Sequence, residues 1–389
     1  DGCHCSPHNL IEDLCAEALG ALAPSLAWGS AARVQVAHAA LLLVVGLYTV
    51  VLPYLSPEWL EENVEAEAVR THADAAEHKK LFRLLLLVLG VLDYVCLLVI
   101  LLARRATSRE AVKRLVLSTC TDRKRRAEVV AVFRQSYAVS VLMLALTISA
   151  FFSVSVSLDY PNPMHFFFGW TPALVPAWAL LQLATFIRLM ASLALKEVEA
   201  FCSRLDVAEG DCTEGEEGDC RCKRGYWLEM LRNHQLLAHN LMGLSRAIST
   251  TILLFQNIVA CPSLMMLMVA KASKGSPTSS LVYIMLGFVL ACSGIMAMLP
   301  LASTTELCRS RRAGTRSLLT LADRFGCQPM PFEVHCEYMR FMQHITTVEA
   351  GIYVPTMGLV TRSSLIGKIM FYLKVLPLAF LFTLRWWRA

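Results

Sequence analysis

The stretch LIGKIMFYLKVLPLAFLF, Leu365 to Phe382, decides the fold, because it is an apolar run long enough to cross a membrane as a helix. It contains a charge that looks buried, Lys374, and a proline, Pro377. A turn-like apolar run, 350–355, and a polar link, 361–364, precede it. The chain therefore ends in a predicted membrane helix that follows a polar link.

The composition predicts a membrane protein. The chain has 389 residues, of which 56% are hydrophobic and 17% are charged. A soluble protein of this length carries about a quarter charged residues. The sequence contains no internal repeat and starts at Asp1 without a visible signal peptide, so we expect some N-terminal residues to be missing.

Seven apolar stretches are long enough to span a bilayer, so the predicted class is an all-α polytopic protein with seven transmembrane helices. The predicted spans are Val34–Pro53, Leu84–Ala103, Tyr137–Leu158, Trp170–Leu195, Ile248–Ala270, Leu281–Ser303 and Leu365–Phe382. The predicted organisation is an N-terminal segment 1–33, spans one to six over 34–303 with polar loops 104–134 and 196–243, and a lead-in with the last span over 304–389.

The distribution of Lys and Arg predicts the orientation. The loops 104–134, 196–243 and 304–362 contain ten, six and at least five of these residues, whereas the loops 58–80, 159–165 and 271–280 contain three, none and two. Basic loops stay in the cytoplasm. The N-terminus is therefore expected inside and the C-terminus outside, which is opposite to a G-protein-coupled receptor.

The layout and the end of the chain resemble the insect gustatory and odorant receptor superfamily. That family has a run of the type Gly-Phe-apolar-Leu-polar-Arg-Ser-Leu-Leu, followed by Gly and by Thr-Tyr-(five apolar)-Gln-Phe. The matching positions here are Ala350–Pro355, Thr361–Gly367 and Phe371–Tyr372, and weaker similarities lie at Leu19–Pro24 and Leu228–Leu244. Of the Thr-Tyr and Gln-Phe positions only Tyr372 is kept, and Lys374 has no standard equivalent in the family.

The resemblance implies a ligand-gated, non-selective cation channel built as a homo- or heterotetramer of like subunits. In that family the seventh helix lines the pore, and the cytoplasmic ends of helices four to seven form an anchor. The ligand, a small-molecule tastant or odorant, binds among the outer halves of helices two, three, four and six. The resemblance also implies a multi-pass protein of the plasma membrane of a sensory neuron, in contact with lipid, with no enzymatic activity and no cofactor.

Five residues of the last span are the candidate pore-lining positions. Tyr372, Leu376 and Ala379 share one helical face, although a lipid- or core-facing stripe has the same spacing. Leu378 is added because Leu378 and Ala379 stand at the positions of the family's Gln-Phe pair, which forms a constriction of the pore in that family. A ring of four Lys374 side chains would repel cations. Three alternatives for the pore then remain: it is poorly selective for cations, it admits anions, or it does not conduct. In the alternative interpretation, Lys374 lies off the pore axis or extends to the interface.

Aromatic residues are the candidate ligand contacts, since apolar cavities lined by aromatic rings suit small ligands. They are Phe152, Trp170, Trp178 and Tyr283. Trp170 fits an interfacial anchor equally well. Asp93 and Arg188 are intramembrane charges, which mark function or pair with a partner, and Arg188 can also extend to the interface.

Other functions lack a matching motif. Cys202, Cys212, Cys220 and Cys222 suggest metal only weakly without a Cys-x-x-Cys pair, and they would fit two disulfides if loop 196–243 lay outside. The basic run 123–126 indicates the cytoplasmic side rather than nucleic-acid binding. The remaining alternatives are a G-protein-coupled receptor of opposite topology, a transporter and a non-channel membrane protein.

Overall fold

The computed structural model describes residues 32–55, 75–107, 109–157, 163–207, 224–272, 294–309, 317–327, 330–348, 350–354 and 358–367. In these ranges the fold is all-α apart from one two-stranded hairpin, which confirms the all-α part of the predicted class. The labelled helices are α3 (Ala32–Leu55), α5 (Ala75–Thr107), α6 (Glu110–Thr121), α7 (Arg123–Ser157), α8 (Pro163–Val207), α9 (Tyr226–Ala272), α11 (Leu318–Asp323), η3 (Arg324–Cys327) and α12 (Phe332–Thr347). Two further helical segments cover residues 294–309 and 362–367. The hairpin strands are β1 (Tyr353–Val354) and β2 (Gly358–Leu359).

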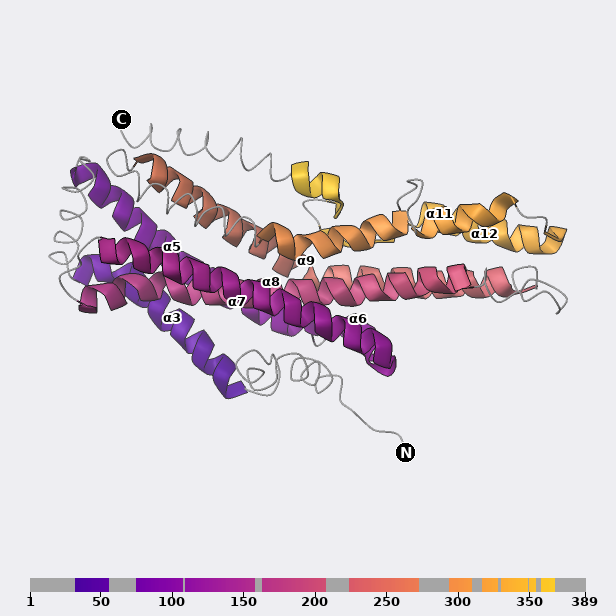
Figure 1. The fold of residues 1–389 in the computed structure, drawn as a ribbon, viewed down its shortest axis with the longest axis horizontal. Helices are drawn as coiled ribbons and strands as arrows, with labels where there is room; N and C mark the ends of the chain where they lie inside the picture. The colour runs from indigo at the N-terminus through magenta and orange to yellow at the C-terminus, as the bar shows by residue number, and fades with distance from the viewer. Residues whose placement is uncertain are drawn as a thin grey trace.

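The helices form an elongated bundle, and α8 and α9 run along most of its length (Figure 1). These two helices have 45 and 47 residues. At a rise of 1.5 Å per residue each is about 70 Å long, whereas the hydrocarbon core of a bilayer is about 30 Å thick. Both helices are therefore long enough to cross a membrane and to continue well beyond it.

The outer faces of α3, α5 and α7 are apolar. On α5, Leu87, Val91, Tyr94, Leu98 and Leu101 are 36–52% exposed, and they recur at intervals of three or four residues. This interval places them in one stripe, about 21 Å long. The other two helices also expose large apolar side chains: Leu41, Leu43, Val44 and Leu47 on α3, and Val139, Val141, Leu142 and Leu146 on α7. Apolar surface of this extent is suited to lipid or to a protein partner rather than to water.

One stretch of the described residues is long and apolar enough, by length and composition alone, to cross a membrane. It is Ala179–Leu205 on α8, and 82% of its most apolar window is buried inside the bundle. Shorter apolar helices cover Ala40–Val51 and Gly90–Ala103. The seven spans and their orientation remain predictions from the sequence.

Much of the two polar segments expected as loops is helical. Segment 104–134 contains the end of α5, all of α6 and the start of α7, while segment 196–243 contains the end of α8 and the start of α9. Lys196 on α8 lies 2.7 Å from Glu128 on α7 in an ion pair that joins these two helices. Trp227 near the start of α9 is fully buried. The bundle therefore continues through both segments.

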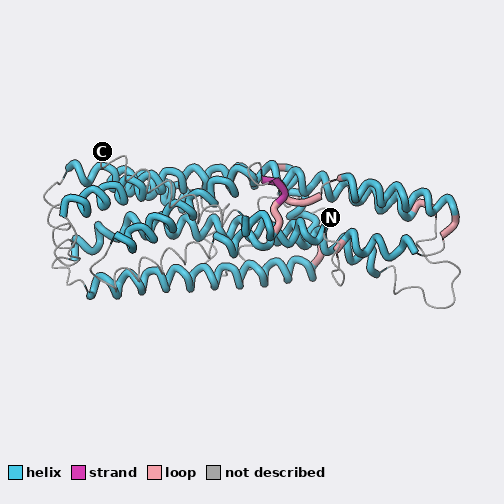
Figure 2. The backbone as a smooth tube through the Cα atoms, turned by 90° about the horizontal axis from the view of Figure 1, so that it is seen from above, coloured by secondary structure: helices cyan, strands magenta, loops and turns pink. Residues whose placement is uncertain are grey.

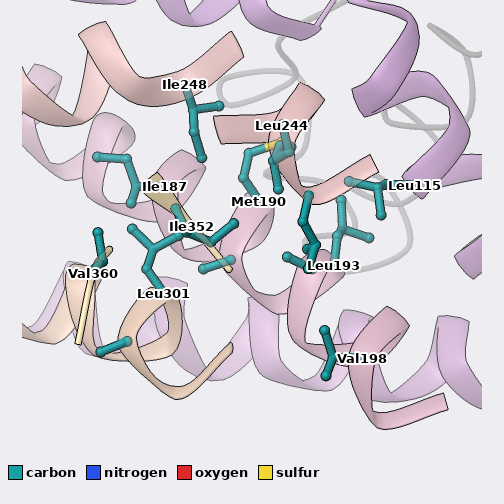
Figure 3. Close-up of a cluster of buried hydrophobic side chains, with 14 of the residues drawn as sticks. Leu115, Ile187, Met190, Leu193, Val198, Leu244, Ile248, Leu301, Ile352 and Val360 are labelled. Atoms are coloured by element: carbon teal, nitrogen blue, oxygen red, sulfur yellow. The ribbon is translucent and has the colours of Figure 1, made fainter. Parts of the chain in front are cut away.

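Buried side chains of α6, α8, α9, helix 294–309 and the hairpin meet in one part of the core. Figure 3 shows Leu115 of α6, Met190 of α8 and Leu244 of α9 gathered there, with Leu301 of helix 294–309 and Ile352 next to β1. Each of these side chains is 0–1% exposed. The hairpin itself lies about midway along the bundle (Figure 2). We call this region the junction core.

Helices α3 and α5 approach each other closely at two glycines. A Cβ atom placed on Gly90 would lie 2.5 Å from Val50 Cγ2 and 2.9 Å from the Gly46 carbonyl oxygen. Real Cβ atoms do not occur at such distances from backbone, so the crossing requires glycine at this position. Asp93 lies beside Gly46 at the same crossing.

Candidate functional site

The candidate site is the short hairpin segment between α12 and the last apolar stretch, residues 350–354 and 358–367. Its strands are antiparallel, with Tyr353 opposite Leu359 and Val354 opposite Gly358. The Val360 amide donates to the Ile352 carbonyl at 2.9 Å and extends the pairing. Ile352, Val354 and Val360 are fully buried, and Ile352 and Val360 point into the junction core (Figure 3). The segment is therefore a packed element rather than a loose connection.

Two hydroxyl groups from neighbouring helices hold the first strand of the hairpin. The Ile352 amide donates to Thr305 Oγ1 of helix 294–309 at 3.1 Å, and the Tyr353 amide donates to Ser245 Oγ of α9 at 3.1 Å. Ser245 and Thr305 are 3% and 0% exposed. Buried amides need such partners, since a buried amide without one lowers the stability of the folded state by about 1–3 kcal/mol. We call Ser245, Thr305 and the hairpin backbone that they bind the hairpin clamp.

Gly351 allows the backbone to come close to Thr305. It has a φ of +154°, a conformation that favours glycine. A Cβ atom there would lie 2.9 Å from Thr305 Cγ2 and 3.0 Å from Leu359 Cδ2. Gly358, with a φ of +67°, supplies the turn between the strands and has open space at its Cβ position. The two glycines thus have different tasks, close packing at Gly351 and chain reversal at Gly358.

The helix that leads into the last apolar stretch has a well-formed start. The Ser364 amide donates to Thr361 Oγ1 at 3.1 Å, and the Thr361 amide donates to Ser364 Oγ at 2.8 Å. This reciprocal pair is a capping box built with serine in place of the usual Glu or Gln. Arg362 adds an ion pair to Glu306, with Nε and Oε2 3.1 Å apart, and its amide donates to Glu306 Oε1 at 3.2 Å. The start of helix 362–367 is therefore fixed to helix 294–309.

A second polar group lies buried between α9 and α12. His234 of α9 is fully buried, and its ring centroid is 5.2 Å from that of His344 on α12. Both nitrogens of His234 and Nε2 of His344 have no hydrogen-bond partner in the described part of the chain. The rings of Phe201 and Phe341 lie 5.8 and 6.4 Å from His234. Burial, and then the charge of His344, lower the pKa of His234 to about 4. Burial also lowers the pKa of His344.

Trp227 is the centre of the aromatic packing at this end of α9. Its ring centroid is 5.0 Å from Tyr338, 5.4 Å from Phe341 and 5.7 Å from Phe325. Contacts of this type add about 0.5–1.5 kcal/mol each to the area that they bury. They hold α12 against α9, so the two histidines lie within a seam that is otherwise apolar and well packed.

The five candidate pore-lining residues, Tyr372, Lys374, Leu376, Leu378 and Ala379, lie outside the described residues, as does Tyr283. The backbones of the other ligand candidates belong to α7, for Phe152, and to α8, for Trp170 and Trp178, but their side chains are outside the described part. The roles of these candidates in the pore and in ligand binding therefore remain predictions from the sequence.

The two intramembrane charges are on described helices. Asp93 of α5 is fully buried, and neither carboxylate oxygen has a hydrogen-bond partner among the described residues. The Nε of Arg188 on α8 is buried and also lacks one. No hydrogen bond joins the two side chains in the described ranges. Asp93 lies at the close crossing of α3 and α5, where an unpaired ionised carboxylate is strongly disfavoured.

The described residues contain no cluster of three or more His, Cys, Asp or Glu suited to a metal ion. Cys202, which the sequence groups with three loop cysteines, is buried on α8 near Cys308 of helix 294–309. Burial, and then the charge of Cys202, raise the pKa of the Cys308 thiol, so this thiol stays protonated. Metal binding requires the thiolate. Cys212, Cys220 and Cys222 lie outside the described residues.

The residues of the hairpin clamp were not identified from the sequence. Ser245 and Tyr353 are 108 residues apart, and Thr305 and Ile352 are 47 apart, so no local pattern connects them. Two local signals were available: the Thr361-x-x-Ser364 spacing of a capping box, and a glycine, Gly351, next to a short apolar run.

The chain matches no model of a known protein family, and no curated protein has a similar sequence.

Proposed function

We propose that this chain is a subunit of a ligand-gated, non-selective cation channel of the gustatory-receptor type, opened by a small-molecule tastant or odorant. The hairpin clamp carries the proposal. It connects the start of the last apolar stretch, the proposed pore helix, to α9 and helix 294–309 through hydrogen bonds of 3.1 Å to Ser245 and Thr305. A shift of these helices is thereby transmitted to the pore helix.

The shape of the bundle supports the proposal. The apolar outer faces of α3, α5 and α7 suit the lipid of a plasma membrane, while α8 and α9 are long enough to continue beyond it. In this arrangement the aromatic seam around Trp227 lies in the cytoplasmic continuation of the bundle. The junction core then lies between the membrane part and the cytoplasmic part.

The proposed mechanism is a rigid displacement passed through the clamp. A ligand that binds among the outer halves of the helices shifts the balance between two packings only if it binds one of them more tightly. The hairpin follows α9 and helix 294–309, because its strand amides and Arg362 are bound to them. The capped helix 362–367 then moves the pore helix, and four such movements in a tetramer open the central pore.

Currents from a matched pair of variants test this proposal. Thr304 and Thr305 are adjacent, fully buried, and both donate to the carbonyl four residues earlier, but only Thr305 also accepts from the hairpin. In cells exposed to a panel of small apolar tastants, we expect Thr305→Val to reduce the evoked current at equal surface expression, and Thr304→Val to leave it unchanged. The absence of any current from wild-type protein at the cell surface would contradict the proposal.

A further inference from the structure

The structure contains a histidine pair, the buried His234 and the partly exposed His344, that the proposed pore mechanism does not use. His234 and His344 face each other across the seam between α9 and α12 at 5.2 Å. Three of their four ring nitrogens have no hydrogen-bond partner in the described ranges. Each neutral imidazole presents one donor and one acceptor. The seam therefore buries polar atoms in an apolar surrounding, where proteins normally provide partners.

Among the described residues, no acidic side chain forms a hydrogen bond or an ion pair with His234. On α8, the neighbouring Phe201 is aromatic, and Cys202 beside it is buried. On α12, Glu337 is one helical turn from Phe341, and its carboxylate accepts from the Gly225 amide at 2.9 Å. Three charged groups of α8 are partly buried but have partners elsewhere: Lys196 pairs with Glu128 and Glu199, and Glu197 accepts from Ser118 Oγ. The other described charged groups near the seam are exposed: Arg204 on α8, Glu229 and Arg232 on α9, Asp323 on α11, Arg324 on η3, and Glu333 and Arg340 on α12. Within the described ranges, His344 is the charged group that lowers the pKa of His234, after the larger effect of burial.

The pair is directly connected to the hairpin clamp. His344 is in the last turn of α12, and its carbonyl accepts from the Val348 amide at 2.8 Å. The Ala350 amide then donates to the Val348 carbonyl at 2.8 Å, and Gly351 follows against Thr305. Movement of the last turn of α12 therefore reaches the clamp within a few residues.

We propose that His234 and His344 form a proton-sensitive latch, which releases the last turn of α12 from α9 when the cytoplasm becomes acidic. A protonated imidazole in this seam has neither a counter-charge nor a hydrogen-bond acceptor in the described part of the chain. Hydration of a charge on the buried His234 requires the last turn of α12 to move away from Phe201 and Phe341. A second proton is opposed by the first, because the rings are close.

This regulation rests on the proposed channel function, but the latch itself does not. Release of α12 removes support from the hairpin, so acidification reduces the transmission of ligand binding to the pore. The chemical stimulus is a membrane-permeant weak acid, which crosses the bilayer in its neutral form and delivers a proton to the cytoplasmic side. A mineral acid applied outside at the same pH lacks this route.

Hydrogen exchange of purified protein tests the latch without any current. The measurement compares α12 amides at pH 7.5 and 5.5, after correction for the intrinsic pH dependence of exchange. We expect the last turn of α12 to exchange at least tenfold faster at pH 5.5 in the wild type. The double variant His234→Gln/His344→Gln should lose this difference. The control His239→Gln/His335→Gln, which changes exposed histidines on the same two helices, should keep it.

Three results would overturn the latch. The first is α12 protection in the wild type that does not depend on pH. The second is an unchanged pH dependence in the double variant, or in the single His344→Gln variant if the double variant does not fold. The third is slower exchange on addition of Zn²⁺ at pH 7.5 that the His344→Gln variant abolishes, since the pair then holds a metal rather than a proton.

Current recordings separate the latch from the channel. With both proposals correct, acetic acid reduces the ligand-evoked current more than hydrochloric acid does at equal external pH, and His344→Gln removes the difference. A pH-dependent α12 in a protein that gives no current would support the latch and refute the channel. Evoked currents that respond equally to the two acids would refute the regulation.

Discussion

Replacement of Gly351 by alanine tests the hairpin clamp at its closest contact. The new Cβ atom would lie 2.9 Å from Thr305 Cγ2, and Thr305 is fixed on helix 294–309 by its own bond to the Leu301 carbonyl at 3.3 Å. Alanine at a φ of +154° also adds backbone strain of about 1–3 kcal/mol. Crowding in a packed core adds about 1–3 kcal/mol more. We therefore expect Gly351→Ala to lower the free energy of unfolding by about 2–6 kcal/mol.

Gly358→Ala is the matched control. Gly358 also has a positive φ, +67°, but a Cβ atom there meets no atom within 4 Å. Its replacement should lower the free energy of unfolding by about 1–2 kcal/mol, because alanine disfavours the left-handed backbone conformation. The difference between the two variants thus isolates the contact with Thr305, since both glycines belong to the same hairpin.

Thermal unfolding of purified protein in one detergent measures this difference. Gly351→Ala should unfold at a clearly lower temperature than Gly358→Ala. Thr305→Ser removes Cγ2 while it keeps the hydroxyl. It should therefore restore about 1 kcal/mol of the free energy of unfolding in the Gly351→Ala variant and none in the Gly358→Ala variant. Equal losses in the two single variants, or no recovery with Thr305→Ser, would refute the close contact and with it the clamp.

Three further predictions follow from the same packing. Gly90→Ala should destabilise the protein by about 1–3 kcal/mol in thermal unfolding, because its Cβ would lie 2.5 Å from Val50 Cγ2. The control is Gly367→Ala, whose Cβ has no atom within 4 Å, and it should be neutral or stabilising. The folded pKa of His234 is about 4, below the unfolded value, so stability should be full above about pH 6.5 and fall as the pH decreases toward 4. The expected loss between pH 7.5 and 5.5 is about 1 kcal/mol, and His234→Gln should remove it in denaturant titrations. Glu306→Gln should cost less than about 1 kcal/mol, and less still in high salt, because the Glu306 and Arg362 side chains are 34% and 61% exposed.

The sequence predicts the helices well where long apolar runs decide them. The spans expected at Val34–Pro53 and Leu84–Ala103 lie within α3 and α5, and the apolar stripe from Leu87 to Leu101 has the helical interval expected of such a span. The segments 104–134 and 196–243 were expected as polar loops, and the structure continues the bundle through much of them. Their many charged residues lie mainly on outer faces, while Trp227 and its neighbours face inward, and a count of charges does not separate the two faces.

The candidate site was harder to predict, for a physical reason. Ser245 and Thr305 resemble ordinary helix residues in the sequence, since each also bonds to the carbonyl four residues earlier. Their bonds to Tyr353 and Ile352 come from the tertiary approach of distant segments. His234 lies in the segment Leu228–Leu244, but no local pattern connects it with His344, because 110 residues separate them. Contacts between residues so far apart produce no periodic pattern in the sequence from which they could be predicted.

Ion selectivity tests the central claim most directly. The measurement is the reversal potential of currents from purified protein in a planar bilayer with unequal KCl concentrations on the two sides, for wild type and Lys374→Glu. If the last apolar stretch lines a cation-conducting pore, Lys374→Glu should move the reversal potential toward the potassium equilibrium potential, because a ring of carboxylates replaces a ring of ammonium groups. The absence of current from folded protein, or the same reversal potential in both proteins, would contradict the account.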